Sequence, residues 1–138
     1  MKGRIGIVAA NYYEELVEEM VERAERKAED SGFETSKVEV AGAFDTPLAA
    51  DRLARKQSID AVVVVGAIVK GETDHDKVIG DAVANRISEI SLERDKPVAL
   101  GISGPGMSAE QARERKDYGA NAVEAAIKSI KNLEEVDD

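Results

Sequence analysis

Residues 61–69, Ala61-Val62-Val63-Val64-Val65-Gly66-Ala67-Ile68-Val69, decide the fold of this chain. A run this long, apolar and rich in β-branched residues predicts a strand buried inside a parallel sheet. The polar pentad Gly71-Glu72-Thr73-Asp74-His75 follows it and predicts the start of a helix. Open α/β sheets bind ligands at the carboxyl ends of their strands, and His75 is the only histidine in the chain. The stretch therefore indicates acid–base chemistry on an anionic substrate, since a helix start can hold an anion.

Strands and helices are predicted to alternate on both sides of this run. Strands are expected at residues 4–10, 33–40, 60–69 and 97–102, and helices at 13–31, 74–94 and 108–132, with a further helix that begins at Pro47. The strand at 33–40 alternates apolar and polar residues, as an edge strand does. This order predicts an α/β protein, a flavodoxin-like three-layer α/β/α sandwich with a four-stranded parallel sheet and helices on both faces. A single domain spanning residues 1–138 is expected.

Capping residues and apolar spacing predict how the helices are placed. Thr46 is expected to cap the second helix with Pro47 at its first position, and Ser108 with Gln111 forms a capping box before the last helix. The side chains expected to face inward are Leu48, Leu53 and Ala54 on the second helix and Val78, Ala82, Ile87 and Ile90 on the third.

The composition excludes several classes of protein. Hydrophobic residues make up 43% and charged residues 34%, so the chain is globular, and only the acidic tail 134–138 is expected to fray. There are no cysteines and one histidine, which argues against disulfides and most metal sites. A net charge of −9 disfavours binding to nucleic acids or anionic membranes. The apolar start at residues 4–10 is better explained as a strand than as a signal peptide, and no run is long enough to cross a membrane. We expect a cytoplasmic protein.

Two further strand ends carry side chains that can bind a substrate. Tyr12 and Tyr13 follow the first strand, where an aromatic ring can stack on a flat heterocycle. Packing of one ring under the helix is the simpler explanation of the pair taken alone. In the segment 42–47, Asp45 can accept hydrogen bonds from substrate hydroxyls, although helix capping is the simpler role for Asp45 and Thr46.

The end of the last strand gives weaker signals. The glycine-rich stretch 101–107 lacks the lysine of a P-loop and the spacing of a dinucleotide site, so a tight turn or a subunit contact is favoured over nucleotide binding. Arg113 and Arg115 lie one turn into the last helix, where either can complete an anion site or form a surface salt bridge with a neighbouring glutamate. The corresponding alternative for His75 is a solvent-exposed surface residue.

Three segments taken together resemble the motif series of the lumazine synthase family: residues 42–47, 66–75 and 111–115. Their order and spacing extend the resemblance over nearly the whole chain, and residues 101–107 with 117–119 resemble the archaeal branch. The resemblance implies a transferase of riboflavin biosynthesis that uses no cofactor and no metal. Such an enzyme condenses 5-amino-6-ribitylaminouracil with 3,4-dihydroxy-2-butanone 4-phosphate, giving 6,7-dimethyl-8-ribityllumazine and phosphate in the penultimate step of the pathway.

The family pattern also implies roles for residues of this chain. His75 is implied to be the proton shuttle. The implied phosphate ligands are Gly71, Glu72, Thr73 and Arg115. The implied contacts of the pyrimidine and its ribityl chain are Tyr12, Ala43, Phe44, Asp45, Ile68, Val69 and Leu100. Active sites in the family lie between subunits of a pentamer, with Leu100 and Arg115 contributed by the adjacent chain, and some members assemble pentamers into icosahedral shells.

The chain departs from the family pattern at three places. Tyr13 stands where asparagine is common, Asp45 stands where many relatives have glutamate, and no residue matches a family lysine near 119–122. The alternatives to lumazine synthase are an archaeal-type riboflavin synthase, a non-catalytic flavin-binding module and a structural shell protein. The pentad 71–75 favours lumazine synthase, because it resembles the signature of the phosphate-eliminating enzyme.

Overall fold

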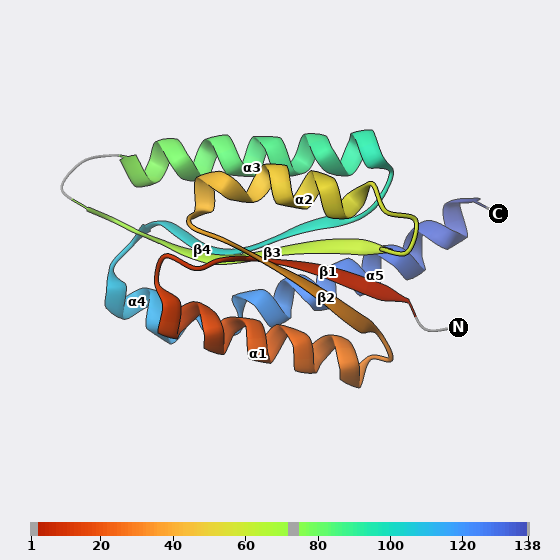
Figure 1. Cartoon of the computed structure of the whole chain (residues 1–138), viewed down its shortest axis with the longest axis horizontal. Helices are drawn as coiled ribbons and strands as arrows, with labels where there is room; N and C mark the ends of the chain where they lie inside the picture. Colours follow the sequence, from red (N-terminus) through yellow and green to blue (C-terminus); the bar gives the residue numbers. More distant parts are fainter. Residues whose placement is uncertain (1–2, 72–74, 138) are drawn as a thin grey trace.

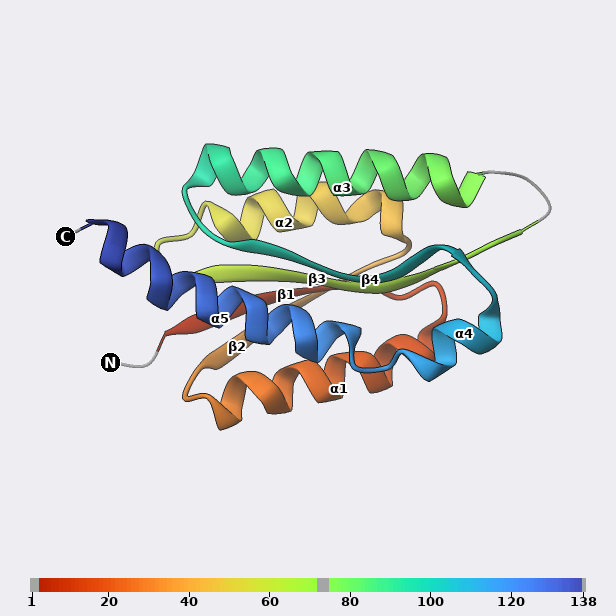
Figure 2. The ribbon, with the colours of Figure 1, turned by 180° about the vertical axis from the view of Figure 1, so that it is seen from behind.

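The computed structural model describes residues 3–71 and 75–137, in which four strands form one parallel sheet in the order β2-β1-β3-β4. The strands are β1 (Arg4–Ala10), β2 (Glu34–Val40), β3 (Ala61–Val69) and β4 (Val98–Met107). The helices are α1 (Glu14–Asp30), α2 (Thr46–Ala54), α3 (His75–Arg94), α4 (Ala109–Glu114) and α5 (Tyr118–Asp137), with a short 3-10 turn η1 (Ala43–Asp45). Figure 1 shows α2 and α3 on one face of the sheet and α1 and α5 on the other, and Figure 2 shows the same layers from behind. The predicted three-layer sandwich is confirmed.

The apolar run of β3 lies inside the sheet, between β1 and β4. Residues 61–68 are all buried, because helices cover both faces. Val63 and Val65 point into a cluster with α1 and α5, whereas Val62 and Val64 point into a cluster with α2 and α3. Side chains of a strand alternate between its two faces, so this one run contributes to both halves of the core. β2 forms one edge of the sheet, as its alternating sequence predicts.

The inner faces of α2 and α3 differ in part from the prediction. Leu48 is 62% exposed and Val78 is 68% exposed, and Ala82 is also exposed, so all three were wrongly assigned to the core. The buried positions of α3 are Asp76, Gly80, Val83, Ile87 and Ile90. The first two turns of α3 bury a polar residue, Asp76, and a glycine, Gly80, because both contact the end of β4. The spacing of apolar residues therefore predicts the wrong inward-facing positions in these two turns.

Thr46 does not cap α2, in contrast to the prediction. It lies inside the helix, and its buried hydroxyl donates to the carbonyl of Ala43 at 2.7 Å. Pro47 does lie in the first turn, where a missing N–H costs nothing. The chain therefore passes from the preceding 3-10 turn, η1, directly into this helix.

β4 is longer than predicted and continues through the glycine-rich stretch to Met107. Gly104 and Gly106 have φ of 105° and 85°, values that side-chain-bearing residues rarely adopt, and the Gly104–Pro105 peptide is cis. The amide of Lys70 donates to the carbonyl of Met107 at 2.7 Å, which holds the ends of β3 and β4 together. The stretch is therefore an irregular strand end rather than a tight turn, and the alternative that we gave, a subunit contact, stays a prediction.

The predicted last helix is two helices, α4 and α5, that meet at residues 115–117. The capping box of Ser108 and Gln111 is confirmed at the start of α4. The break is tied to α1 by ion pairs from Lys116 to Glu19 at 3.0 Å and from Asp117 to Arg23 at 2.9 Å. The hydrogen bond from Lys116 lowers the pKa of Glu19. Residues 134–137 are helical and exposed, and the fraying expected there stays a prediction.

Candidate active site

A pocket of about 300 Å³ opens at the carboxyl end of the sheet. It is bounded by the β1–α1 connection, the start of η1, the end of β3 and the first turns of α3. The lining residues are Tyr12, Tyr13, Gly42, Ala43, Phe44, Ala67, Ile68, Val69, Gly71, His75, Asp76 and Ile79. Three segments far apart in the sequence, with His75 among them, therefore meet as the strand-end rule predicts.

Aromatic rings form one wall of the pocket. Tyr12 is 74% exposed, and its ring meets that of Tyr13 edge-to-face, with centroids 4.9 Å apart and planes at 83°. Tyr13 packs against the apolar cluster between α1, α5 and the sheet, and this packing holds its ring in place. Phe44 is also largely exposed at the rim. Two exposed rings facing an apolar cavity provide surfaces on which a planar ligand can stack.

The end of β3 forms the floor. Ile68 and Val69 line the pocket, and the register of β3 against β4 shifts between Ala67 and Val69. Gly104 lies against this point, since a Cβ there would stand 2.2 Å from the carbonyl oxygen of Ile68. The backbone of the pocket floor is thus held in place by the end of β4.

The start of α3 forms the opposite wall and carries His75 and Asp76. Asp76 is 7% exposed, and its Oδ2 accepts a hydrogen bond from the amide of Gly106 at 2.9 Å. Gly71 lines the pocket, whereas the predicted phosphate ligands Glu72 and Thr73 lie outside the described residues. The pocket therefore has an imidazole and the N-terminus of a long helix on one side, a combination suited to proton transfer beside an anion.

Asp45 lies beside the pocket but is not one of its lining residues. Its Oδ2 accepts a hydrogen bond from the amide of Gly42 at 3.1 Å, which closes the η1 turn. Asp45 precedes α2 as its N-cap residue, but its side chain makes no capping hydrogen bond to that helix, so the capping role that we considered the simpler one is found only within η1. A contact between Asp45 and a substrate hydroxyl stays a prediction.

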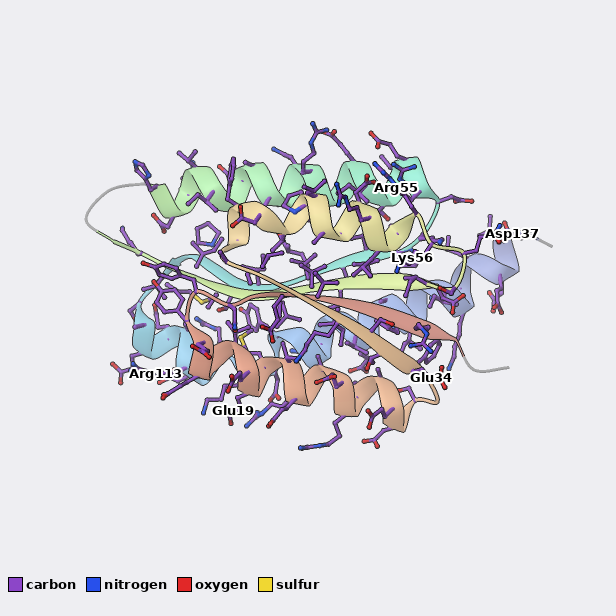
Figure 3. All side chains as sticks on the ribbon, viewed as in Figure 1. Glu19, Glu34, Arg55, Lys56, Arg113 and Asp137 are labelled. Carbon is purple, nitrogen blue, oxygen red and sulfur yellow. The ribbon has the colours of Figure 1, made fainter. Side chains whose placement is uncertain are left out.

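Leu100, Arg113 and Arg115 are not joined to the pocket within this chain. Leu100 is 43% exposed on β4, an edge strand, and Arg115 is half-buried with Nη1 at 3.3 Å from the sulfur of Met107. Arg113 lines a separate cavity of about 290 Å³ with Tyr13 and Val69. Figure 3 shows Arg113 on α4, beside the first turns of α1.

Sequence reasoning assigned no site role to four lining residues, namely Gly42, Ala67, Asp76 and Ile79, and it considered Tyr13 only together with Tyr12 as a strand-end pair. Gly42 and Ala67 adjoin predicted residues, and proximity in sequence was a usable signal. Ile79 could have been found from helical spacing, because it lies four residues after His75. For Asp76 helical spacing gives no signal, because residues one apart on a helix do not face the same side.

Two properties of the described residues, 3–71 and 75–137, bear on other kinds of function. No group of three or more histidine, cysteine or acidic side chains there is arranged to hold a metal ion. No helix there is long and apolar enough to cross a membrane.

Comparison with known proteins agrees with the resemblance seen in the sequence. The family model of 6,7-dimethyl-8-ribityllumazine synthase matches residues 2–134. A 6,7-dimethyl-8-ribityllumazine synthase of Halorubrum lacusprofundi is 53% identical over 124 residues, which cover 89% of this chain and 92% of that protein. The protein of the same name from Halobacterium salinarum is 52% identical, with 94% and 98% coverage. That from Methanococcus maripaludis is 47% identical, with 96% and 98% coverage.

Proposed function

We infer the reaction from the fact that this chain belongs to the 6,7-dimethyl-8-ribityllumazine synthase family. The enzyme condenses 5-amino-6-ribitylaminouracil with 3,4-dihydroxy-2-butanone 4-phosphate and releases phosphate. We propose that the strand-end pocket holds both substrates. The observation that carries this proposal is the meeting of Tyr12, the end of β3 and His75 around one cavity.

The pyrimidine is proposed to bind between Tyr12 and the floor of the pocket. The exposed Tyr12 ring supplies a face for stacking, and the backbone of Ile68 and Val69 supplies amide and carbonyl groups for the edge of the ring. Ala43 and Phe44 are on the side where the ribityl chain would extend. Asp45 could reach a ribityl hydroxyl with the carboxylate oxygen that does not bind Gly42.

The phosphate is proposed to bind at the start of α3. Backbone amides of residues 71–73 and the hydroxyl of Thr73 would provide donors, and the helix dipole favours an anion there. Arg115 is proposed to reach this phosphate from a neighbouring copy, because in its own chain it lies beside Met107, outside the pocket.

His75 is proposed to move protons during imine formation and phosphate loss. The amine nitrogen must lose protons as it attacks the ketone, and the carbinolamine oxygen must gain one before it leaves as water. Elimination of phosphate then removes a proton from the carbon next to the imine. An imidazole can serve each step in turn because its pKa lies near neutrality.

Assembly and location are also proposals. Leu100 lies exposed on edge strand β4, and a neighbouring subunit that covers it would contribute Leu100 and Arg115 to the shared site. A homopentamer, alone or built into an icosahedral shell, fits this arrangement. We propose a cytoplasmic location.

An assay with both substrates, followed by lumazine absorbance, tests the reaction. His75→Ala is expected to lower kcat about a hundredfold without abolishing turnover, because proximity and orientation still act. Arg86→Ala, on the exposed side of the same helix, serves as the matched control and should leave kcat unchanged. Normal turnover by His75→Ala would refute the histidine role, and riboflavin formation from lumazine alone would refute the reaction. Inhibition by inorganic phosphate is expected, and its absence would refute the proposed anion site.

A further inference from the structure

We propose that Asp76 is a positioning residue that clamps the end of β4 to the first turn of α3 and thereby fixes His75 beside the pocket. The inference rests on the proposed function, since it concerns the geometry of that reaction. Asp76 adjoins His75 in sequence and lines the same pocket.

The first observation is the state of the Asp76 carboxylate. The side chain is 7% exposed, and its Oδ2 accepts the amide hydrogen of Gly106 at 2.9 Å. Burying a carboxylate is costly unless it is hydrogen-bonded, and a bond from a backbone amide to a charged acceptor is a strong one. The position in the first helical turn also favours a negative charge. An apolar side chain would fill the same space at lower cost, so packing alone does not explain Asp76.

The second observation is that α3 touches the same segment one turn later. A Cβ on Gly80 would stand 2.7 Å from Cδ and 2.9 Å from Cγ of Pro105, so the helix backbone rests directly on that ring. The hydrogen bond of Asp76 therefore fixes the orientation of this helix end, and the contact at Gly80 fixes the distance between the helix and the end of β4. Two attachments to adjacent residues, 105 and 106, restrict rotation of the helix end.

The third observation connects the clamp to the pocket floor. Gly104 lies against the carbonyl of Ile68, and the amide of Lys70 binds the carbonyl of Met107. Contacts therefore run from α3 through residues 104–107 to the end of β3. His75 and Ile68 both line the pocket, so the clamp sets the separation of the imidazole from the floor.

The reaction is sensitive to that separation. A displacement of about 1 Å in a positioned group can lower a rate about a hundredfold. The stacking ring of Tyr12 is held by Tyr13 and lies outside this chain of contacts. Losing the Asp76 bond releases α3 from β4, while the pocket floor keeps its own contacts with Gly104 and Met107. The step at His75 and the phosphate beside it should thus be affected, while the pyrimidine, held by Tyr12 and the floor, remains bound normally.

The test compares Asp76→Ala and Asp76→Asn with the control Asp81→Asn, which changes an exposed carboxylate on the same helix. Steady-state kinetics give kcat and both KM values, and hydrogen–deuterium exchange follows the peptide containing residues 104–107. For Asp76→Ala we expect kcat/KM for the butanone phosphate to fall about tenfold or more, because this variant loses a charge-assisted hydrogen bond. The KM for the pyrimidine should change less than twofold, and exchange at 104–107 should accelerate. Asp76→Asn keeps an acceptor oxygen at the same reach and should recover much of the loss.

Three results would overturn the inference: unchanged kinetics in Asp76→Ala, an equal rise of both KM values, or unaltered exchange at residues 104–107. If Asp76→Ala does not fold, Asp76→Leu, which fills a similar volume without an acceptor oxygen, is tested for the same split between the two KM values. A wild-type chain that makes no lumazine, while Asp76→Ala still accelerates exchange, would refute the proposed function and leave the clamp standing.

Discussion

Gly80→Ala is expected to destabilise this protein, although alanine in place of a helical glycine is usually favourable. The usual gain is about 0.5–1 kcal/mol. Here the added methyl would stand 2.7 Å from Cδ of Pro105, which is about 0.7 Å inside the 3.4 Å at which ordinary contact begins. Pro105 is covalently rigid, so α3 or the end of β4 must shift. Overpacking of this kind costs about 1–3 kcal/mol, and a net loss of about 1 kcal/mol is expected.

Urea unfolding followed by circular dichroism measures this effect. Ser88→Ala, at an exposed position of the same helix, is the matched control and should stabilise slightly, because alanine is the better helix former. Gly80→Ala should also lower kcat, since the forced shift occurs one turn from His75. If Gly80→Ala were as stabilising as Ser88→Ala and fully active, the direct contact between α3 and Pro105 would be refuted.

Two further predictions concern the aromatic wall and the opposite end of the sheet. Tyr13→Leu removes the edge-to-face partner of Tyr12, a contact worth about 0.5–1.5 kcal/mol, so the KM for the pyrimidine should rise about two- to tenfold while Tyr13→Phe stays near normal. Asp51→Asn should lower the free energy of unfolding by about 1 kcal/mol near neutral pH, which urea titrations would measure. Hydrogen bonds from Arg94 and then Arg55 hold the pKa of Asp51 below its ordinary value of 3.8. Its stabilisation is therefore present above that pH and is lost as the pH falls through the lower folded value, so the two proteins should converge in acid.

The strands could be predicted because burial on both faces leaves a direct mark on the sequence. β1 begins and ends where predicted, and β3 begins one residue later, since β-branched runs stop where the sheet stops. The spacing of apolar residues failed to predict the inward-facing positions where a helix packs against something other than an apolar surface. The first turns of α3 bury Asp76 and Gly80, whose partners are an amide and a proline ring, and no hydrophobic pattern records such contacts.

The part of the chain from β4 to α5 shows a second limit of sequence reasoning. Gly104 and Gly106 suggest a turn, yet here their freedom lets a strand continue past a bulge. At the division between α4 and α5, Lys116 and Asp117 form ion pairs with residues of α1, nearly 100 residues earlier in the chain. Local propensity does not contain that information.

For the site, sequence reasoning found the residues at strand ends and missed those that act through neighbours. Tyr12 and His75 follow from the rule that parallel strands present their ends together, and Ile68 is implied by the family resemblance; all three line the pocket. Tyr13 and Asp76 belong to the same pocket through contacts with another ring and another strand. Leu100 and Arg115 do not line the pocket within this chain, and their contribution from a neighbouring copy stays a prediction.

The strand order has a consequence for synthesis on the ribosome. β1 pairs with β2 on one side and with β3 on the other, and β3 comprises residues 61–69. Until about half of the chain has been made, the nascent protein can form β1, α1, β2 and α2 but not β3, and one hydrogen-bonding edge of the apolar β1 is left open. An open apolar edge invites pairing with other chains. The emergence of β3 is therefore the moment at which the growing polypeptide ceases to be prone to aggregation through this edge.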